Sequence, residues 1–112
     1  MELIKLTHQM KKATDRLSRT PKELEERAKT KAQAEYEYRK ALSESILKYK
    51  GEGYPATLIS DLARGEVAHL KLQRDLADGL YTSARESMKA LQAELSGLQT
   101  ITRYNEEVEG KQ

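Results

Sequence analysis

The chain has 112 residues, of which 34% are charged, and it contains no Phe, Trp or Cys. This length suits one domain, and the composition excludes a thick globular core; it suits narrow Leu/Ala seams with charged flanks, as in helical hairpins and coiled coils. The lack of cysteine excludes a disulfide scaffold and thiolate metal sites, and no apolar run approaches the ~20 residues that span a membrane. The apolar stretch at the N-terminus is too short for a signal peptide, so we expect a cytoplasmic protein that is not bound to a membrane.

The net charge of +2 hides an asymmetry between the two halves of the chain. Residues 1–50 carry 13 Lys/Arg and 8 Asp/Glu, a net +5, whereas residues 51–112 carry 7 and 10, a net −3. If the halves fold back on each other as antiparallel helices, these opposite charges attract. A basic N-terminal half that meets an acidic partner or nucleic acid is the alternative.

Residues 3–18 predict a basic amphipathic helix. Its apolar face, which should pack on the rest of the protein, consists of Leu3, Leu6, Met10, Ala13 and Leu17. Its basic face consists of Lys5, Lys12, Arg16 and Arg19, with Lys11 nearby. A solvated basic face is the simplest interpretation, and contact with a phosphate backbone, a membrane surface or an acidic partner is the alternative. If there is an acidic partner, we predict that these five cations contact it.

The segment 20–23 predicts the start of a second helix. Thr20 can cap the next turn, Pro21 suits the first helical position, and Glu23 can reach back to the cap. Because the heptad phase nevertheless runs through this break, we expect a kink after which the chain continues in the same direction. A full reversal into a three-helix bundle is the alternative.

The second helix is predicted over residues 21–49 and should end at a left-handed Gly51. Its core-facing positions are mostly small, so the partner helix must approach closely: Leu24, Ala28, Ala34, Tyr38, Ala41, Leu42, Ile46 and Tyr49. A turn follows, in which Tyr54 is a further candidate contact for a partner. A short helix over residues 55–64 should then end at Gly65.

A long helix is predicted over residues 66–108, because apolar or small residues recur at alternating steps of three and four. This seam comprises Val67, Leu70, Ala77, Tyr81, Ala84, Met88, Leu91, Leu95 and Leu98, and Thr102 and Asn105 continue it. A second apolar row, Leu72, Leu76 and Leu80, needs cover from the short helix or from a second subunit. We predict a homo-oligomer, a dimer, in which these three leucines mediate self-association.

Arg74 interrupts the seam of the long helix. A charged residue at such a position costs stability unless it is paired, and Glu35 on the second helix is a candidate partner. Two further interpretations stay open: the side chain reaches out to solvent, or it fixes the register or oligomeric state of the helices.

Catalytic and metal-binding signals are weak in this sequence. There is no cysteine nucleophile, no phosphate-binding or dinucleotide-binding motif, and His8 and His69 lie on different predicted helices. Glu66-x-x-His69 has the spacing of helical di-iron ligands, but these residues lie beside the seam, whereas ligands should face the interior. We therefore expect no enzymatic activity, no metal and no cofactor.

Three segments, residues 34–42, 54–65 and 71–81, together resemble small uncharacterised helical proteins of bacteriophages and prophages of Gram-positive bacteria. The resemblance covers about residues 30–100 and brings no catalytic motif. Such proteins are commonly encoded near genes for recombination, annealing or single-strand-binding proteins, so the resemblance implies a role in phage DNA metabolism within the host cytoplasm.

These observations predict one all-α domain, residues 1–112: an elongated, coiled-coil-like antiparallel helical hairpin with an N-terminal amphipathic helix and a short helix in the connection. The expected function is non-enzymatic. We expect the protein to act as an adaptor or inhibitor that binds a host or phage protein of DNA metabolism, such as a nuclease, recombination or replication protein. Direct binding of nucleic acid by the basic face and a structural coiled coil of a virion are the alternatives.

Overall fold

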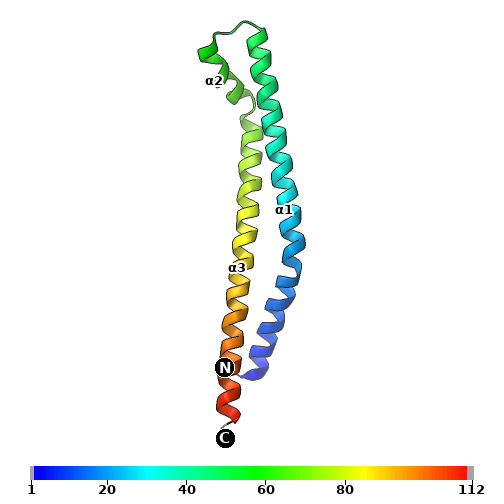
Figure 1. The fold of residues 1–112 in the computed structure, drawn as a ribbon, viewed down its shortest axis with the longest axis vertical. Helices are drawn as coiled ribbons and strands as arrows, with labels where there is room; N and C mark the ends of the chain where they lie inside the picture. The colour runs from blue at the N-terminus through cyan, green and yellow to red at the C-terminus, as the bar shows by residue number, and fades with distance from the viewer. Residues whose placement is uncertain (1, 111–112) are drawn as a thin grey trace. The chain divides into compact units, whose positions relative to one another are not determined.

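The computed structural model describes residues 2–110, which form three α-helices and no strand. Helix α1 spans Leu3–Gly51, α2 spans Ala56–Glu66 and α3 spans Ala68–Gly110 (Figure 1). The predicted all-α fold of antiparallel helices with a short helix in the connection is confirmed. The predicted bounds of the second and third of these helices agree with the observed ones to within two residues.

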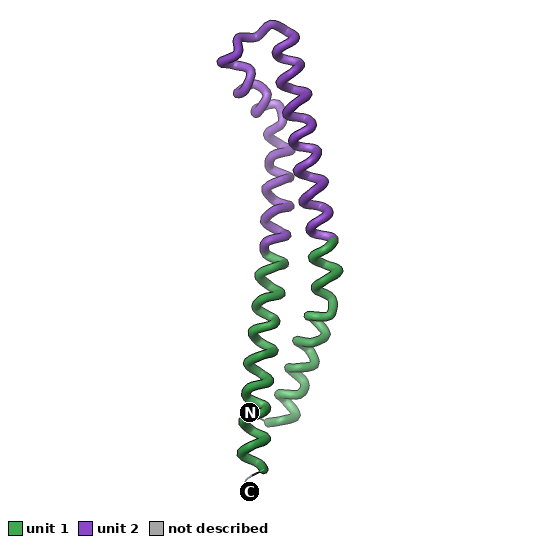
Figure 2. The backbone as a smooth tube through the Cα atoms, viewed as in Figure 1, with its two compact units in different colours: residues 1–25, 83–112 green, residues 26–82 purple. Residues whose placement is uncertain are grey.

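The chain divides into two compact units, each of which contains a segment of α1 beside an antiparallel segment of α3 (Figure 2). Unit 1 is formed by the described residues of the ranges 1–25 and 83–112. Unit 2 is formed by residues 26–82 and includes α2. The prediction of a single domain over the whole chain stays a prediction.

The predicted helix boundary at Pro21 is wrong, because α1 continues through it without interruption. Thr20 does not cap a new helix: its hydroxyl donates to the carbonyl of Arg16 at 3.1 Å, one turn back within the same helix. Pro21 has no N–H, so the carbonyl of Leu17 lacks its usual partner. A proline inside a helix is unfavourable by ~3 kcal/mol, but the unbroken heptad phase lets the side chains on both sides of Pro21 pack, and the reversal into a bundle does not occur.

In unit 1 the predicted heptad positions form the interface between the helices. Leu6 and Ala13 of α1 and Leu91 and Leu98 of α3 are buried, with at most 8% of each residue exposed. The hydroxyl of Thr102 also lies 3.3 Å from the sulfur of Met10 on the other helix. These contacts confirm the seam that the sequence predicts for this part of α3.

In unit 2 the interface on α1 differs from the prediction. Ala28 and Ile46 are exposed, whereas Arg27 and Lys31 are half-buried and Ser45 is buried at the heptad positions beside them. The prediction was based on apolar residues, but the heptad phase, which continues unbroken from the first turns of α1, determines which residues face inward. Long basic side chains tolerate such positions because their aliphatic stems pack while the charge stays in water.

The turns around α2 also differ in detail from those predicted. Gly51 belongs to α1, and the left-handed residue is Gly53, with φ of 82°, the only such residue among those described. Gly65 lies inside α2, and the break between α2 and α3 falls at Val67, whose φ and ψ are −105° and 14°. Val67 is 4% exposed, so the break between the two helices is anchored in the interior of unit 2.

Candidate interaction surfaces

The three leucines predicted to mediate self-association form a row on α3 of unit 2, which we call the leucine face. Leu72, Leu76 and Leu80 are 60%, 59% and 48% exposed. Helix α2 does not cover them: it buries Ala63 and leaves its own Leu58 and Leu62 50% and 36% exposed. Cover by the short helix, one of the two predicted explanations, is therefore wrong.

The basic face on α1 of unit 1 comprises Lys5, Lys12, Arg16 and Arg19. At about 100° per residue, these four positions fall within about 60° of one another around the helix, and Lys11 points about 100° away from Lys12. All five side chains are exposed, and none has an ion-pair partner among residues 2–110. The structure thus places four of the five predicted cations on one side of the helix.

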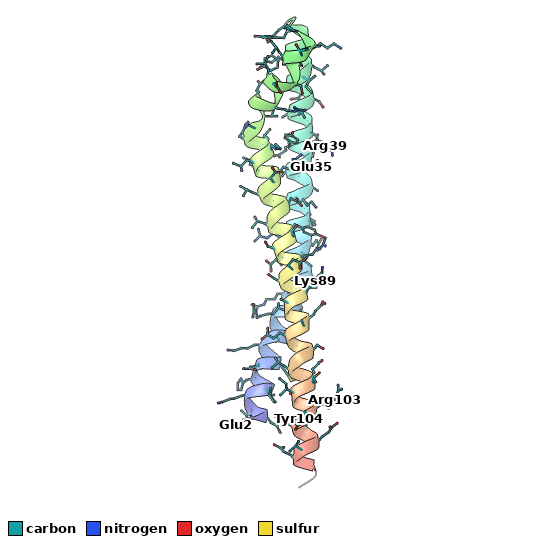
Figure 3. The ribbon with its side chains drawn as sticks, turned by 90° about the vertical axis from the view of Figure 1, so that its left-hand side faces the viewer. Glu2, Glu35, Arg39, Lys89, Arg103 and Tyr104 are labelled. Carbon is teal, nitrogen blue, oxygen red and sulfur yellow. The ribbon has the colours of Figure 1, made fainter. Side chains whose placement is uncertain are left out.

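Arg74 lies at the centre of a polar cluster in unit 2. Its guanidinium is 3.5 Å from Glu35 on α1 and 3.1 Å from Asp75, and it stacks 4.4 Å above the ring of Tyr38. Hydrogen bonding to Asp75 raises the pKa of Arg74 further, with a smaller contribution from Glu35. The predicted pairing with Glu35 is confirmed. Figure 3 shows Glu35 beside Arg39, to which it is also bonded at 2.6 Å.

A second polar cluster fixes the end of α2 to α1. Glu66 accepts hydrogen bonds from the buried Ser45 hydroxyl at 2.6 Å and from the Lys48 ammonium at 2.7 Å. The bonds from Lys48, then Ser45, and a weaker one from Tyr49 lower the pKa of Glu66 from 4.5 to about 2. We call these four residues the Glu66 cluster. Its signal in the sequence is the heptad position of Ser45, a polar residue that a pattern of apolar residues does not include.

The same cluster bears on the metal-like spacing of Glu66 and His69. Both carboxylate oxygens of Glu66 are already bonded to donors of α1. Among the described residues, no group of three His, Cys, Asp or Glu side chains is arranged to hold a metal ion.

Tyr54, the predicted contact residue in the turn, already packs against another aromatic ring of unit 2. Its ring lies edge-on to that of Tyr49, with centroids 5.3 Å apart, and it remains 43% exposed. Tyr54 belongs to unit 2, whereas the residues of the basic face belong to unit 1.

Comparison of the chain with known protein families, with curated proteins and with solved structures finds no match. The resemblance to phage proteins therefore stays a hypothesis that depends on the three sequence segments. Within residues 2–110, no helix combines the length and apolar character needed to cross a membrane.

Proposed function

We propose that this chain is a non-enzymatic protein–protein interaction module that pairs with a second copy of itself through the leucine face. The observation that carries the proposal is the exposure of Leu72, Leu76 and Leu80, which form a second apolar row on α3 beside its seam. Three adjacent half-exposed leucines on a charged helix are typical of an interface between proteins.

The spacing of the row suits a symmetric pair. In a two-fold interface the same patch serves both copies, so residue i of one copy contacts residue j of the other and the reverse. An evenly spaced row matches itself when one helix is turned end to end: Leu76 meets its own counterpart, and Leu72 meets Leu80. Next to this row, a Cβ added to Gly79 would touch nothing within 4 Å, so a second helix has room to approach.

The expected dimer is weak. Covering a half-exposed leucine stabilises by roughly 1 kcal/mol, and six leucines would therefore contribute about 6–8 kcal/mol. Association itself costs at least ~4 kcal/mol, which leaves at most about 2–4 kcal/mol and a dissociation constant of about 1 mM or weaker.

The biological role we propose is that of an adaptor or inhibitor of a nucleic-acid-processing protein in the cytoplasm of a bacterium, the host cell if the gene belongs to a phage. The resemblance of residues 34–42, 54–65 and 71–81 to phage and prophage proteins supports this context. The weakness of catalytic signals in the sequence supports a binding function over an enzymatic one.

Sedimentation equilibrium up to about 2 mM, the concentration range that a millimolar dissociation constant requires, tests the pairing. We expect the wild-type mass to rise above 12.8 kDa with concentration, and Leu76→Glu to hold it at 12.8 kDa. The matched control is Leu47→Glu, a leucine 67% exposed on α1 of unit 2, which should leave association unchanged. A wild-type mass of 12.8 kDa throughout, or equal loss in both variants, contradicts the proposal.

Capture experiments test the partner. We expect tagged wild-type protein to retain a nuclease, recombination or replication protein from host lysate, and the identified protein to bind when purified. Recovery of nucleic acid alone, or of nothing that binds when purified, contradicts the adaptor role.

A further inference from the structure

We propose that the basic face of unit 1 binds the phosphate backbone of duplex nucleic acid. The basic face consists of residues of unit 1 and the leucine face of residues of unit 2, so binding at the basic face does not require the dimer. Lys5, Lys12, Arg16 and Arg19 align on one side of α1, without an ion-pair partner among the described residues.

The cations of unit 2 provide the contrast. Lys31, Lys48 and Arg74 each reach a carboxylate on another helix, at 3.1, 2.7 and 3.5 Å. Lys40 and Lys50, exposed cations of unit 2 that lack such a partner, point about 80° apart around α1. The positive charge of the basic face is thus uncompensated by the fold, and it is concentrated in one line.

The dimensions of this line suit a linear polyanion. Lys5 and Arg19 are 14 positions apart, or about 21 Å along the helix axis. Duplex DNA presents one phosphate charge per ~1.7 Å of its axis, so a helix lying along the backbone can bring all four cations near phosphates. Three exposed carboxylates border the face, and they limit its extent rather than divide it: Glu2 one turn before Lys5, Asp15 at its edge, and Glu23 one turn beyond Arg19.

The residues around the four cations favour a phosphate backbone over a protein. The exposed neighbours at the edges of the face are His8 and Gln9, and no apolar side chain lies among the four cations. Protein interfaces have an apolar centre, which this surface lacks. Single-stranded nucleic acid is bound largely by stacking on aromatic rings, and the basic face contains none; the exposed Tyr104 of unit 1 lies on the other helix, α3. A contact limited to cations is what a duplex backbone requires.

The test measures binding of a fluorescent duplex of mixed sequence, about 30 base pairs long, by anisotropy between 50 and 200 mM salt. Four phosphate contacts predict a slope of log K against log salt near −3.6 and a loss of about 100-fold in affinity over that range. The variant K5Q/K12Q/R16Q/R19Q should lose measurable binding, and Gln keeps the helix propensity of the replaced residues.

The matched control is K40Q/K50Q/K71Q/R103Q, which removes the same charge from exposed cations that also lack ion-pair partners among residues 2–110. Both variants should keep the helical circular dichroism of the wild type, and the control should keep most of the affinity and the slope. If the basic-face variant unfolds, R16Q alone should still lower the slope by about 0.9. Equal loss in both four-fold variants, a slope near zero, tighter binding of single-stranded DNA, or tighter binding of polyglutamate at equal salt would overturn the proposal.

Discussion

In unit 1 the buried side chains include Leu6, Leu91 and Leu98, whereas the buried apolar residues of unit 2 are Ala63, Val67 and Ala77. Smaller residues remove less apolar area from water and therefore stabilise less. Unit 2 joins its helices with polar contacts, through the Arg74 and Glu66 clusters and the 3.1 Å pair of Lys31 with Asp78. The same pair of helices is thus held by apolar burial in one unit and largely by charge in the other.

This difference has a consequence for the two proposed surfaces. In unit 2 several charges pair between helices, and the exposed surface of α3 includes an apolar row, the leucine face. In unit 1 leucines pack between helices, and the exposed surface of α1 includes a row of cations, the basic face. The two proposed surfaces therefore differ in character in the same way as the two interiors, with the roles of charge and apolar area exchanged.

The largest expected effect comes from the interior of unit 1. Leu98→Ala should lower the free energy of unfolding by about 2–4 kcal/mol, because it leaves a cavity at a position that is 8% exposed. Urea unfolding followed by circular dichroism measures this loss. Leu47→Ala, at a residue 67% exposed, should cost less than about 0.5 kcal/mol. Similar losses in both variants would mean that the seam does not hold unit 1 together.

A smaller effect, of opposite sign, is expected at Pro21 in α1. Pro21→Ala should raise the free energy of unfolding by about 1–3 kcal/mol, since it restores the hydrogen bond to the Leu17 carbonyl and removes the clash of the ring. The same urea titration measures it. Pro55→Ala is the control, because Pro55 precedes α2, where a proline costs little. A destabilised Pro21→Ala protein would show that unit 1 requires the local helix geometry that the proline ring imposes on α1.

Much of this fold could be predicted because heptad spacing is a strong signal over long helices. Every seam position predicted for the long helix, from Val67 to Asn105, is buried or half-buried in its unit. The errors came from local signals that tertiary packing overrides: the capping residues before Pro21 and the apolar character of Ala28 and Ile46. The Glu66 cluster could not be predicted from composition, since it joins residues 21 positions apart in the chain, Ser45 and Glu66, across a turn.

The two candidate surfaces could likewise be predicted only in part. Leu72, Leu76 and Leu80 were predictable as an apolar row, but only the structure shows that α2 leaves them uncovered. The basic residues were predictable as a row by their spacing. Their lack of ion-pair partners within the described chain depends on which acidic residues α3 places nearby, and that is a property of the fold.

The smallest expected effect is a pH dependence of the melting temperature, which arises from Glu66 in unit 2. The pKa of Glu66 is about 2 in the folded protein and 4.5 in its ordinary state. A carboxyl group with a lowered folded pKa contributes stability that is fully present above its unfolded value and is lost as the pH falls toward the folded value. Wild type should therefore melt at a higher temperature than Glu66→Gln at pH 7, and this difference should shrink between pH 5 and pH 2. Added salt should also reduce it, because Lys48 and Glu66 are 49% and 39% exposed and their attraction is screened.

The control for this pH experiment is Glu44→Gln, which makes the same chemical change on α1 of unit 2 at a carboxylate with no ion-pair partner among the described residues. Its melting temperature should follow that of the wild type at every pH. A difference between wild type and Glu66→Gln that stays constant from pH 7 to pH 2 would show that Glu66 acts by shape and neutral hydrogen bonding. In that case charge would not hold the end of α2, and the contrast between an apolar unit 1 and a charge-dependent unit 2 would rest on Arg74 and Lys31 alone.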